Sequence, residues 1–227
     1  LPGSTDKERY DELVNMICYA HKNGFQVGVH AIGDKAIEAS IDGFIKAERE
    51  ELKGMRHYII HGDFISEKYA RLAAEYNIGV AAQPAIKWTL ADFMVDIVGD
   101  SKAAWQWPLR TLIDAGTHVS GSSDAPVTYP DWKQGVQSAV LRESKATGRV
   151  SGPEQCITRE EAIRMFTIEG AWQDQMEHIK GSIEVSKLAD LCILDEDILT
   201  VEPHEIKDIR NLMTIIGGRI VYDAGID

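Results

Sequence analysis

Residues 25–34 read FQVGVHAIGD, an apolar run that gives way at His30 to a turn containing glycine. The same change from apolar run to glycine-containing turn recurs at His61 and at Asp124, which lie 31 and then a further 63 residues along the chain. A strand–helix–strand unit takes roughly 30 residues, so these spacings correspond to one repeat and then two. We therefore expect the three residues at the same end of three strands in one parallel sheet.

The chemistry of this trio indicates a metal site. Two imidazoles and a carboxylate are most of the ligand set of a zinc or similar divalent ion. Each residue also has a plainer interpretation when taken alone. A single histidine at a strand end is more often a hydrogen-bonded loop or core residue, and Asp124 within GSSDAP could simply cap a turn. The combination at three matching positions is what favours metal binding.

The rest of the chain alternates between helical and extended patterns. Ser4, Thr5 or Asp6 is expected to cap a first helix that ends at Asn23-Gly24, and Asp34 is expected to cap a second. The expected strands are 25–29, 56–60, 78–82 and 117–120. Further helices are expected from Ser66 to Tyr76 and over 109–115, 132–146 and 159–173, the last opened by a capping box of Thr158 and Glu161.

Residues 85–110 follow no clear pattern and are expected to form an irregular excursion over a site. Trp88, Trp105 and Trp107 in this segment either line a substrate pocket or hold the segment against the body of the protein. Short strands are expected after about residue 180, over 189–194 and as a hairpin of 213–216 with 219–222, since Gly217-Gly218 suits a type I′ turn.

Four strand–helix repeats in series predict an α/β fold, half of a (β/α)8 barrel, in which functional residues follow the strands. The strands near the C-terminus predict a small β element appended to this body. We expect a half-barrel domain over 1–178 and the small β element over 179–227. An open doubly wound sheet is the alternative, but Gly28 and Gly33 lack the GxGxxG spacing of a dinucleotide site.

Other chemistries are less well supported. His57 and His61 would share a metal on a helix, but the residues between them favour a strand, where four residues span about 13 Å. A serine nucleophile at Ser122 or Ser123 lacks the GxSxG elbow. A cysteine zinc site lacks any CxxC pair. The remaining histidines are expected to be structural or exposed, namely His21, His118, His178 and His204.

The overall composition excludes several classes of partner. The 227 residues are 44% hydrophobic and carry a net charge of −12, which argues against nucleic acid and anionic membranes, because both attract basic surfaces. No apolar run reaches the ~18 residues of a membrane span. Three well-separated cysteines, Cys18, Cys156 and Cys192, predict reduced thiols and a cytoplasmic location.

Several segments together resemble a known family. Residues 27–34, 59–62 and 121–127, read as VGVHAIGD, IIHG and GSSDAPV, are similar to the amidohydrolase superfamily. The resemblance is to amidohydrolase family 3, the branch with formamide-deformylase-like and exoenzyme-regulator-like proteins. The C-terminal segments 181–184, 187–191 and 218–222 also resemble the returning strands of that family's β-sandwich. The resemblance therefore implies the second half of the barrel, followed by the C-terminal part of a β-sandwich.

The resemblance implies a metal-dependent hydrolase of C–N bonds other than peptide bonds. It implies His30 and His61 as metal ligands, and Asp124 as both a ligand and the general base. The metal would be zinc, with iron or manganese as alternatives, and the substrate a small amide. Gln83 and Lys87 follow the third strand, near the expected substrate.

The chain departs from the family pattern because it has no His-x-His motif, which the family carries on its first strand. We therefore expect the C-terminal fragment of a longer hydrolase, inactive alone and able to lack metal. Half a barrel has open sheet edges, so we expect self-association or pairing with the N-terminal half. The alternative function is a catalytically inactive binding or regulatory barrel, and tight nucleotide binding is not expected.

Overall fold

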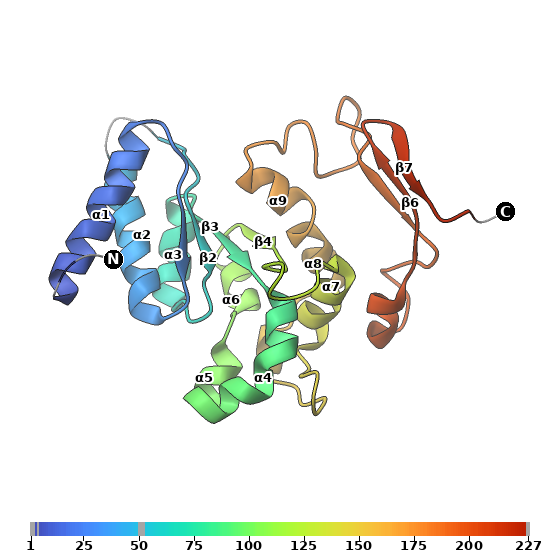
Figure 1. Ribbon diagram of the computed structural model, residues 1–227, viewed down its shortest axis with the longest axis horizontal. Helices are drawn as coiled ribbons and strands as arrows, with labels where there is room; N and C mark the ends of the chain where they lie inside the picture. Colours follow the sequence, from blue (N-terminus) through green and yellow to red (C-terminus); the bar gives the residue numbers. More distant parts are fainter. Residues whose placement is uncertain (1–2, 4, 50–52, 226–227) are drawn as a thin grey trace.

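The computed structural model describes residues 3, 5–49 and 53–225. Four parallel strands form one sheet in the order β1-β2-β3-β4, and three antiparallel strands form a second sheet (Figure 1). The parallel strands are β1 (Gly28–Ala31), β2 (Tyr58–His61), β3 (Gly79–Ala82) and β4 (Val119–Gly121). Since neighbours in the sheet are also successive in sequence, every connection is a crossover of the kind that builds a barrel.

The helices of the first half match the predicted alternation. They are α1 (Asp6–Lys22), α2 (Asp34–Glu48), α3 (Glu67–Glu75) and α6 (Leu109–Asp114). Thr5 caps α1 through a capping box with Glu8, whereas Ser4 lies outside the described residues. The predicted cap of α2 was wrong by one residue, because Gly33 is the N-cap and Asp34 is already helical.

The prediction of an irregular segment over 85–110 was wrong. Two helices occupy most of it, α4 (Pro84–Val98) and α5 (Asp100–Trp105), separated by Gly99 at a φ of +78°. Proline at the first helical position needs no hydrogen-bonded N–H, so Pro84 starts α4 without cost. The tryptophans and aspartates that suggested a loop are compatible with a helix that follows a strand directly.

The two long helices predicted in the second half are shorter than expected. The first is α7 (Trp132–Leu141), which ends at Arg142 in the left-handed conformation. The second divides into α8 (Arg159–Met165) and α9 (Ile168–Gln173), and Thr158 and Glu161 form the predicted capping box. A short 3₁₀ helix, η1 (Pro153–Gln155), precedes α8.

The strands begin up to three residues later than predicted. β1 starts at Gly28 rather than at Phe25, whose side chain is 65% exposed, so His30 lies inside the strand and not after it. His61 is likewise the last residue of β2. Apolar character alone does not determine where a strand begins. Phe25 is apolar, yet it lies in the connection between α1 and β1 and is exposed to solvent.

The core lies between the parallel sheet and the helices that cover it. Fully buried side chains from α2 and from the strands meet there, including Ile37, Ile41, Phe44, Ile59 and Val80. Each large aliphatic or aromatic side chain of this kind contributes roughly 1.5–3 kcal/mol when it is removed from water. This packing holds the strand ends that carry the predicted site.

The second sheet consists of β5 (Leu191–Leu194), β6 (Asn211–Ile216) and β7 (Arg219–Asp223). Gly217 and Gly218 have φ values of +56° and +78°, as the predicted type I′ hairpin requires. The 3₁₀ helix η2 (Pro203–Asp208) packs against α7. In Figure 1 the β6–β7 hairpin and α1 lie at opposite ends of the molecule.

The boundary between residues 178 and 179 stays a prediction, and so does the cytoplasmic location. Within the described residues, none of the helices is both long and apolar enough to cross a membrane.

Candidate active site

His30 and His61 lie side by side at the carboxyl ends of neighbouring strands. In the β1–β2 pairing His30 is opposite Ile60, and Ala31 is opposite His61. The two imidazole rings meet edge to face, with 4.5 Å between their centroids and 74° between their planes. Both rings therefore lie at one edge of the sheet, as the spacing of the two residues predicted.

Asp124 reaches the same place from the turn after β4. The turn is tied to the sheet because the Ser122 N–H donates to the Ala82 carbonyl at 2.9 Å. Asp124 has a left-handed φ of +54°, and its N–H donates to the Ser122 hydroxyl. Its Oδ2 lies 3.8 Å from Nε2 of His61. The structure thus brings the three predicted residues together in one group, the His30–His61–Asp124 group.

The surroundings of His61 favour a neutral ring. Burial lowers the pKa of His61, and the neighbouring His30 lowers it further, while Asp124 and Gln83 act in the opposite direction. A neutral imidazole has a free nitrogen lone pair, which is the form that binds metals. His61 can therefore offer a nitrogen lone pair to a cation, beside the His30 ring and the Asp124 carboxylate.

The backbone of His61 is held in an unusual conformation. His61 has a φ of +81°, which a residue with a side chain rarely adopts. The Trp107 indole N–H donates to the His61 carbonyl at 2.9 Å, and the Trp107 backbone N–H donates to the Asp63 carbonyl at 2.7 Å. Trp107, only 1% exposed, thus holds the carbonyls of both residues that flank Gly62.

Arg142 fixes the segment that carries Trp107. Its buried guanidinium donates to the backbone carbonyls of Ala104, Gln106, Trp107 and Ser151, all at 2.9 Å. The three bonds to Ala104, Gln106 and Trp107 leave this segment little freedom to move, and the fourth ties it to Ser151. This role could not be predicted from the sequence, because backbone carbonyls have no residue type to identify them.

Gln83 and Lys87, the predicted substrate-binding residues, are both buried. Gln83 Nε2 donates to the Ala81 carbonyl, and Lys87 Nζ donates to the Ala103 carbonyl and to the Ser151 hydroxyl. Burial, with a smaller contribution from Arg142, lowers the pKa of Lys87 to about 7. Only 2% of Lys87 is exposed, so its position favours a structural role.

Asp63, two residues after His61, belongs to the same buried network. Its Oδ2 accepts a hydrogen bond from Gln106 Nε2 at 2.6 Å. Burial raises the pKa of Asp63 to about 6. The spacing His61-Gly62-Asp63 was the available sequence signal, and the sequence reasoning missed it.

A second histidine pair lies at the opposite end of β2. Single ligand atoms of His21, Glu48 and His57 lie within 4.8 Å of one another, a spacing that a cation could bridge. The hydrogen bonds favour a different arrangement. Nδ1 of His57 accepts from the Val27 N–H at 3.0 Å, so the proton of this ring lies on Nε2.

That proton is donated to Nδ1 of His21, 2.9 Å away. The proton of His21 then lies on its Nε2, a buried atom without a hydrogen-bond partner in the described structure. A metal-binding histidine instead donates its second N–H to an acceptor. We therefore assign His21 and His57, the His21–His57 pair, a structural role.

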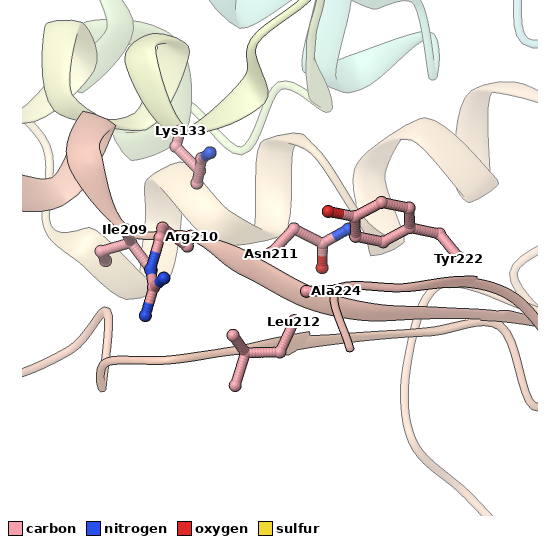
Figure 2. Close-up of a pocket in the computed structure, with 7 residues that line it drawn as sticks. All are labelled: Lys133, Ile209, Arg210, Asn211, Leu212, Tyr222 and Ala224. Carbon is pink, nitrogen blue, oxygen red and sulfur yellow. The ribbon is translucent and has the colours of Figure 1, made fainter. Parts of the chain in front are cut away.

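Two pockets lie outside these clusters. The larger, about 490 Å³, lies where α7 meets the second sheet and is lined by Lys133, Arg210, Asn211 and Tyr222, among others (Figure 2). It contains none of the predicted site residues. The smaller, about 320 Å³, is called the Trp88 pocket; its main lining residues are Trp88, Val127, Thr128, Tyr129, Asp131 and Lys145.

Comparison with known proteins identifies the class. Residues 3–222 match the amidohydrolase family, so this chain belongs to that family. It is 30% identical over 227 residues to a Bacillus subtilis (strain 168) protein named as the amidohydrolase YtcJ, covering 98% of the chain and 42% of that protein. It is 26% identical to the N-substituted formamide deformylase of Arthrobacter pascens, covering 93% of the chain and 39% of the enzyme.

Solved structures agree with the fold. A metal-dependent hydrolase from Pyrococcus furiosus superposes with a TM-score of 0.70 at 30% identity, over 84% of this chain and 38% of that one. A metal-dependent hydrolase from Pyrococcus horikoshii gives a TM-score of 0.73 at 24% identity. The predicted fold, half of a barrel with part of a second β domain, is confirmed. The chain spans less than half the length of these relatives.

Proposed function

We propose that this chain supplies one half of the active site of a metal-dependent hydrolase that cleaves C–N bonds in small, non-peptide amides. The observation that carries the proposal is the convergence of His30, His61 and Asp124 at one edge of the sheet. Membership of the amidohydrolase family and similarity to a formamide deformylase support it. In this proposal His30, His61 and Asp124 are metal ligands, and Asp124 is also the general base.

The geometry of the group fits a divalent metal. Two donor atoms bound to one tetrahedral zinc ion lie about 3.4 Å apart. Nε2 of His61 and Oδ2 of Asp124 are 3.8 Å apart, too far for a hydrogen bond and close to this spacing. Two imidazoles and a carboxylate suit zinc best, and iron or manganese also accept them.

The residues of this chain would divide the work of hydrolysis. A divalent ion held here supplies Lewis acidity, polarising the amide carbonyl and lowering the pKa of a water molecule. His30 and His61 fix the position of the reacting centre. Asp124 accepts the proton of the attacking water and returns it to the leaving amine. Trp107 keeps His61 in the required backbone conformation.

The site requires a partner to be complete. Three ligands from one side of a barrel leave coordination positions on the metal that another protein segment can fill. β1 and β4 are the edge strands of the parallel sheet, and exposed edge strands can pair with another chain. We propose that either a second copy of this chain or an N-terminal half pairs with these edges. A monodisperse monomer of this chain in light scattering would contradict the pairing of two copies.

Cobalt titration of the 227-residue chain tests the metal site, because bound Co²⁺ gives visible absorption bands. We expect His61→Gln and Asp124→Asn to weaken cobalt binding at least ~10-fold. The matched control is His118→Gln, since His118 pairs with Glu169 and stacks on Trp172 away from the group. Unchanged affinity in the His61 variant, or a loss that appears with His57→Gln instead, would contradict the proposal.

A second measurement separates the enzyme from the inactive binding protein. The assay follows hydrolysis of an N-substituted formamide, the substrate class named for the Arthrobacter relative, by the chain together with its proposed partner half. Metal binding with formate release supports the hydrolase. Metal binding without turnover of this or other small amides supports the regulatory alternative.

A further inference from the structure

We propose that the Trp88 pocket binds a carboxylate carried by the substrate, and that Lys145 is the residue that recognises it. This inference rests on the proposed function, because it assigns the pocket to the substrate of the neighbouring His30–His61–Asp124 group. It adds a substrate class, namely amides whose apolar body ends in an acid.

The pocket is continuous with the catalytic turn. The Val127 N–H donates to the carbonyl of Asp124 at 2.8 Å, and the Thr128 hydroxyl donates to the carbonyl of Ser123. Both residues line the pocket. Trp88 also lines the pocket and lies one turn into α4, the helix that begins directly after Gln83. A molecule in the pocket therefore lies next to the backbone of the proposed general base.

Lys145 supplies a positive charge that is not neutralised. Its Nζ lies 5.0 Å from the centre of the Trp88 ring, and its backbone N–H donates to the Trp88 carbonyl at 2.7 Å. Among the described residues, no carboxylate lies within ion-pair distance of it. The ammonium is thus anchored to one wall of the pocket and is free to pair with an anion.

The carboxylate already in the pocket does not cancel this charge. Asp131 is the N-cap of α7, where it accepts a hydrogen bond from the Lys133 N–H at 3.0 Å. Its Oδ1 also lies 3.7 Å from Nζ of Lys133. Asp131 is therefore committed to the start of α7 and to Lys133.

The remaining walls suit an apolar body. Val127 is 63% exposed and Tyr129 is 84% exposed, although both are large apolar side chains, and the Trp88 indole lies beside them. Such side chains beside a catalytic group provide contact area for an aliphatic or aromatic ligand. The chain carries a net charge of −12, which repels anions at long range. An acidic substrate therefore needs a local cation, which Lys145 provides.

Binding of two matched ligands tests the inference. N-formyl-phenylalanine carries the acid, and N-formyl-phenylalanine amide is its neutral counterpart. Calorimetry at low salt is expected to show about fivefold tighter binding of the acid, the scale of a partly exposed ion pair. Lys145→Met should abolish this preference, and Lys145→Arg should keep it.

The matched control is Lys46→Met, which removes the same charge from an exposed position on α2. It should leave the preference for the acid unchanged. Equal binding of the two ligands to the unaltered chain, no binding of either, or a preference that survives Lys145→Met would each overturn the inference. The readout is binding rather than turnover, so it stands apart from the cobalt test of the proposed metal ligands.

Discussion

The two ends of strand β2 hold histidines in opposite situations. At the amino end, His57 uses both ring nitrogens in hydrogen bonds within the protein, and burial together with His21 lowers its pKa to about 4. At the carboxyl end, His61 faces His30 and lies 3.8 Å from Asp124, beyond hydrogen-bond distance. Histidines close together in space thus do not by themselves indicate a metal site; the direction of each ring's hydrogen bonds decides.

Replacing one histidine of each pair by alanine gives the largest expected difference in stability. His57→Ala should destabilise the fold by about 3 kcal/mol, because it leaves the Val27 N–H and His21 unpaired and opens a buried cavity. His30→Ala should change stability by less than about 0.5 kcal/mol, since His30 is exposed. Urea unfolding followed by circular dichroism measures both. Equal losses in the two variants would remove the distinction between the pairs.

Acid should weaken the fold through the His21–His57 pair. The pKa of His57 is lowered from 6.5 to about 4 in the folded state, so the unfolded state takes up the proton first as the pH falls. The contribution of His57 to the free energy of unfolding is complete above pH 6.5 and is lost progressively as the pH falls toward 4. At about 1.4 kcal/mol per pH unit, the free energy of unfolding should fall by about 2 kcal/mol between pH 7 and pH 5.

The lowered pKa of His61 acts in the same direction. The His57→Gln variant should therefore show a shallower pH dependence that is not flat. Denaturant titrations at several pH values provide the measurement. A slope that is unchanged in His57→Gln would place the titrating group elsewhere.

Removing one hydrogen bond at the carboxyl end of β2 should have the smallest effect on stability of these changes. Its effect on metal affinity should be larger. Trp107→Phe deletes the indole N–H that donates to the His61 carbonyl, at a cost of about 1 kcal/mol. Because that bond holds His61, cobalt affinity should fall about tenfold. Trp105→Phe is the matched control, since its indole N–H donates to Ile65 instead. A similar loss of affinity in both variants would show a general effect on folding.

Local signals predicted much of the framework. The cap of the first helix at Thr5, the capping box at Thr158 and the Gly217-Gly218 hairpin depend on residues close in sequence, and the structure contains all three. The spacing of His30, His61 and Asp124 predicted their convergence because one strand–helix repeat has a nearly fixed length. These predictions needed no knowledge of distant contacts.

The remaining features depend on contacts between distant segments. The predicted helix over 159–173 breaks between Met165 and Ile168, and the ring of Phe166 there packs against Gly121 and Gly135. Arg142 and Trp107 act on backbone carbonyls 35 and 46 residues away in the chain. No residue pattern marks such acceptors, so the hydrogen bonds by which Arg142 and Trp107 position the site could not be predicted from the sequence.

The packing of Phe166 also limits how this protein can change. A Cβ atom added at Gly121 or at Gly135 would come within 2.6 Å or 2.4 Å of the Phe166 ring. A side chain at either glycine can be accepted only together with a smaller residue at position 166. The three positions, on strand β4, on helix α7 and in the turn between α8 and α9, therefore have to mutate in concert, and a library that varies them one at a time would find few folded members.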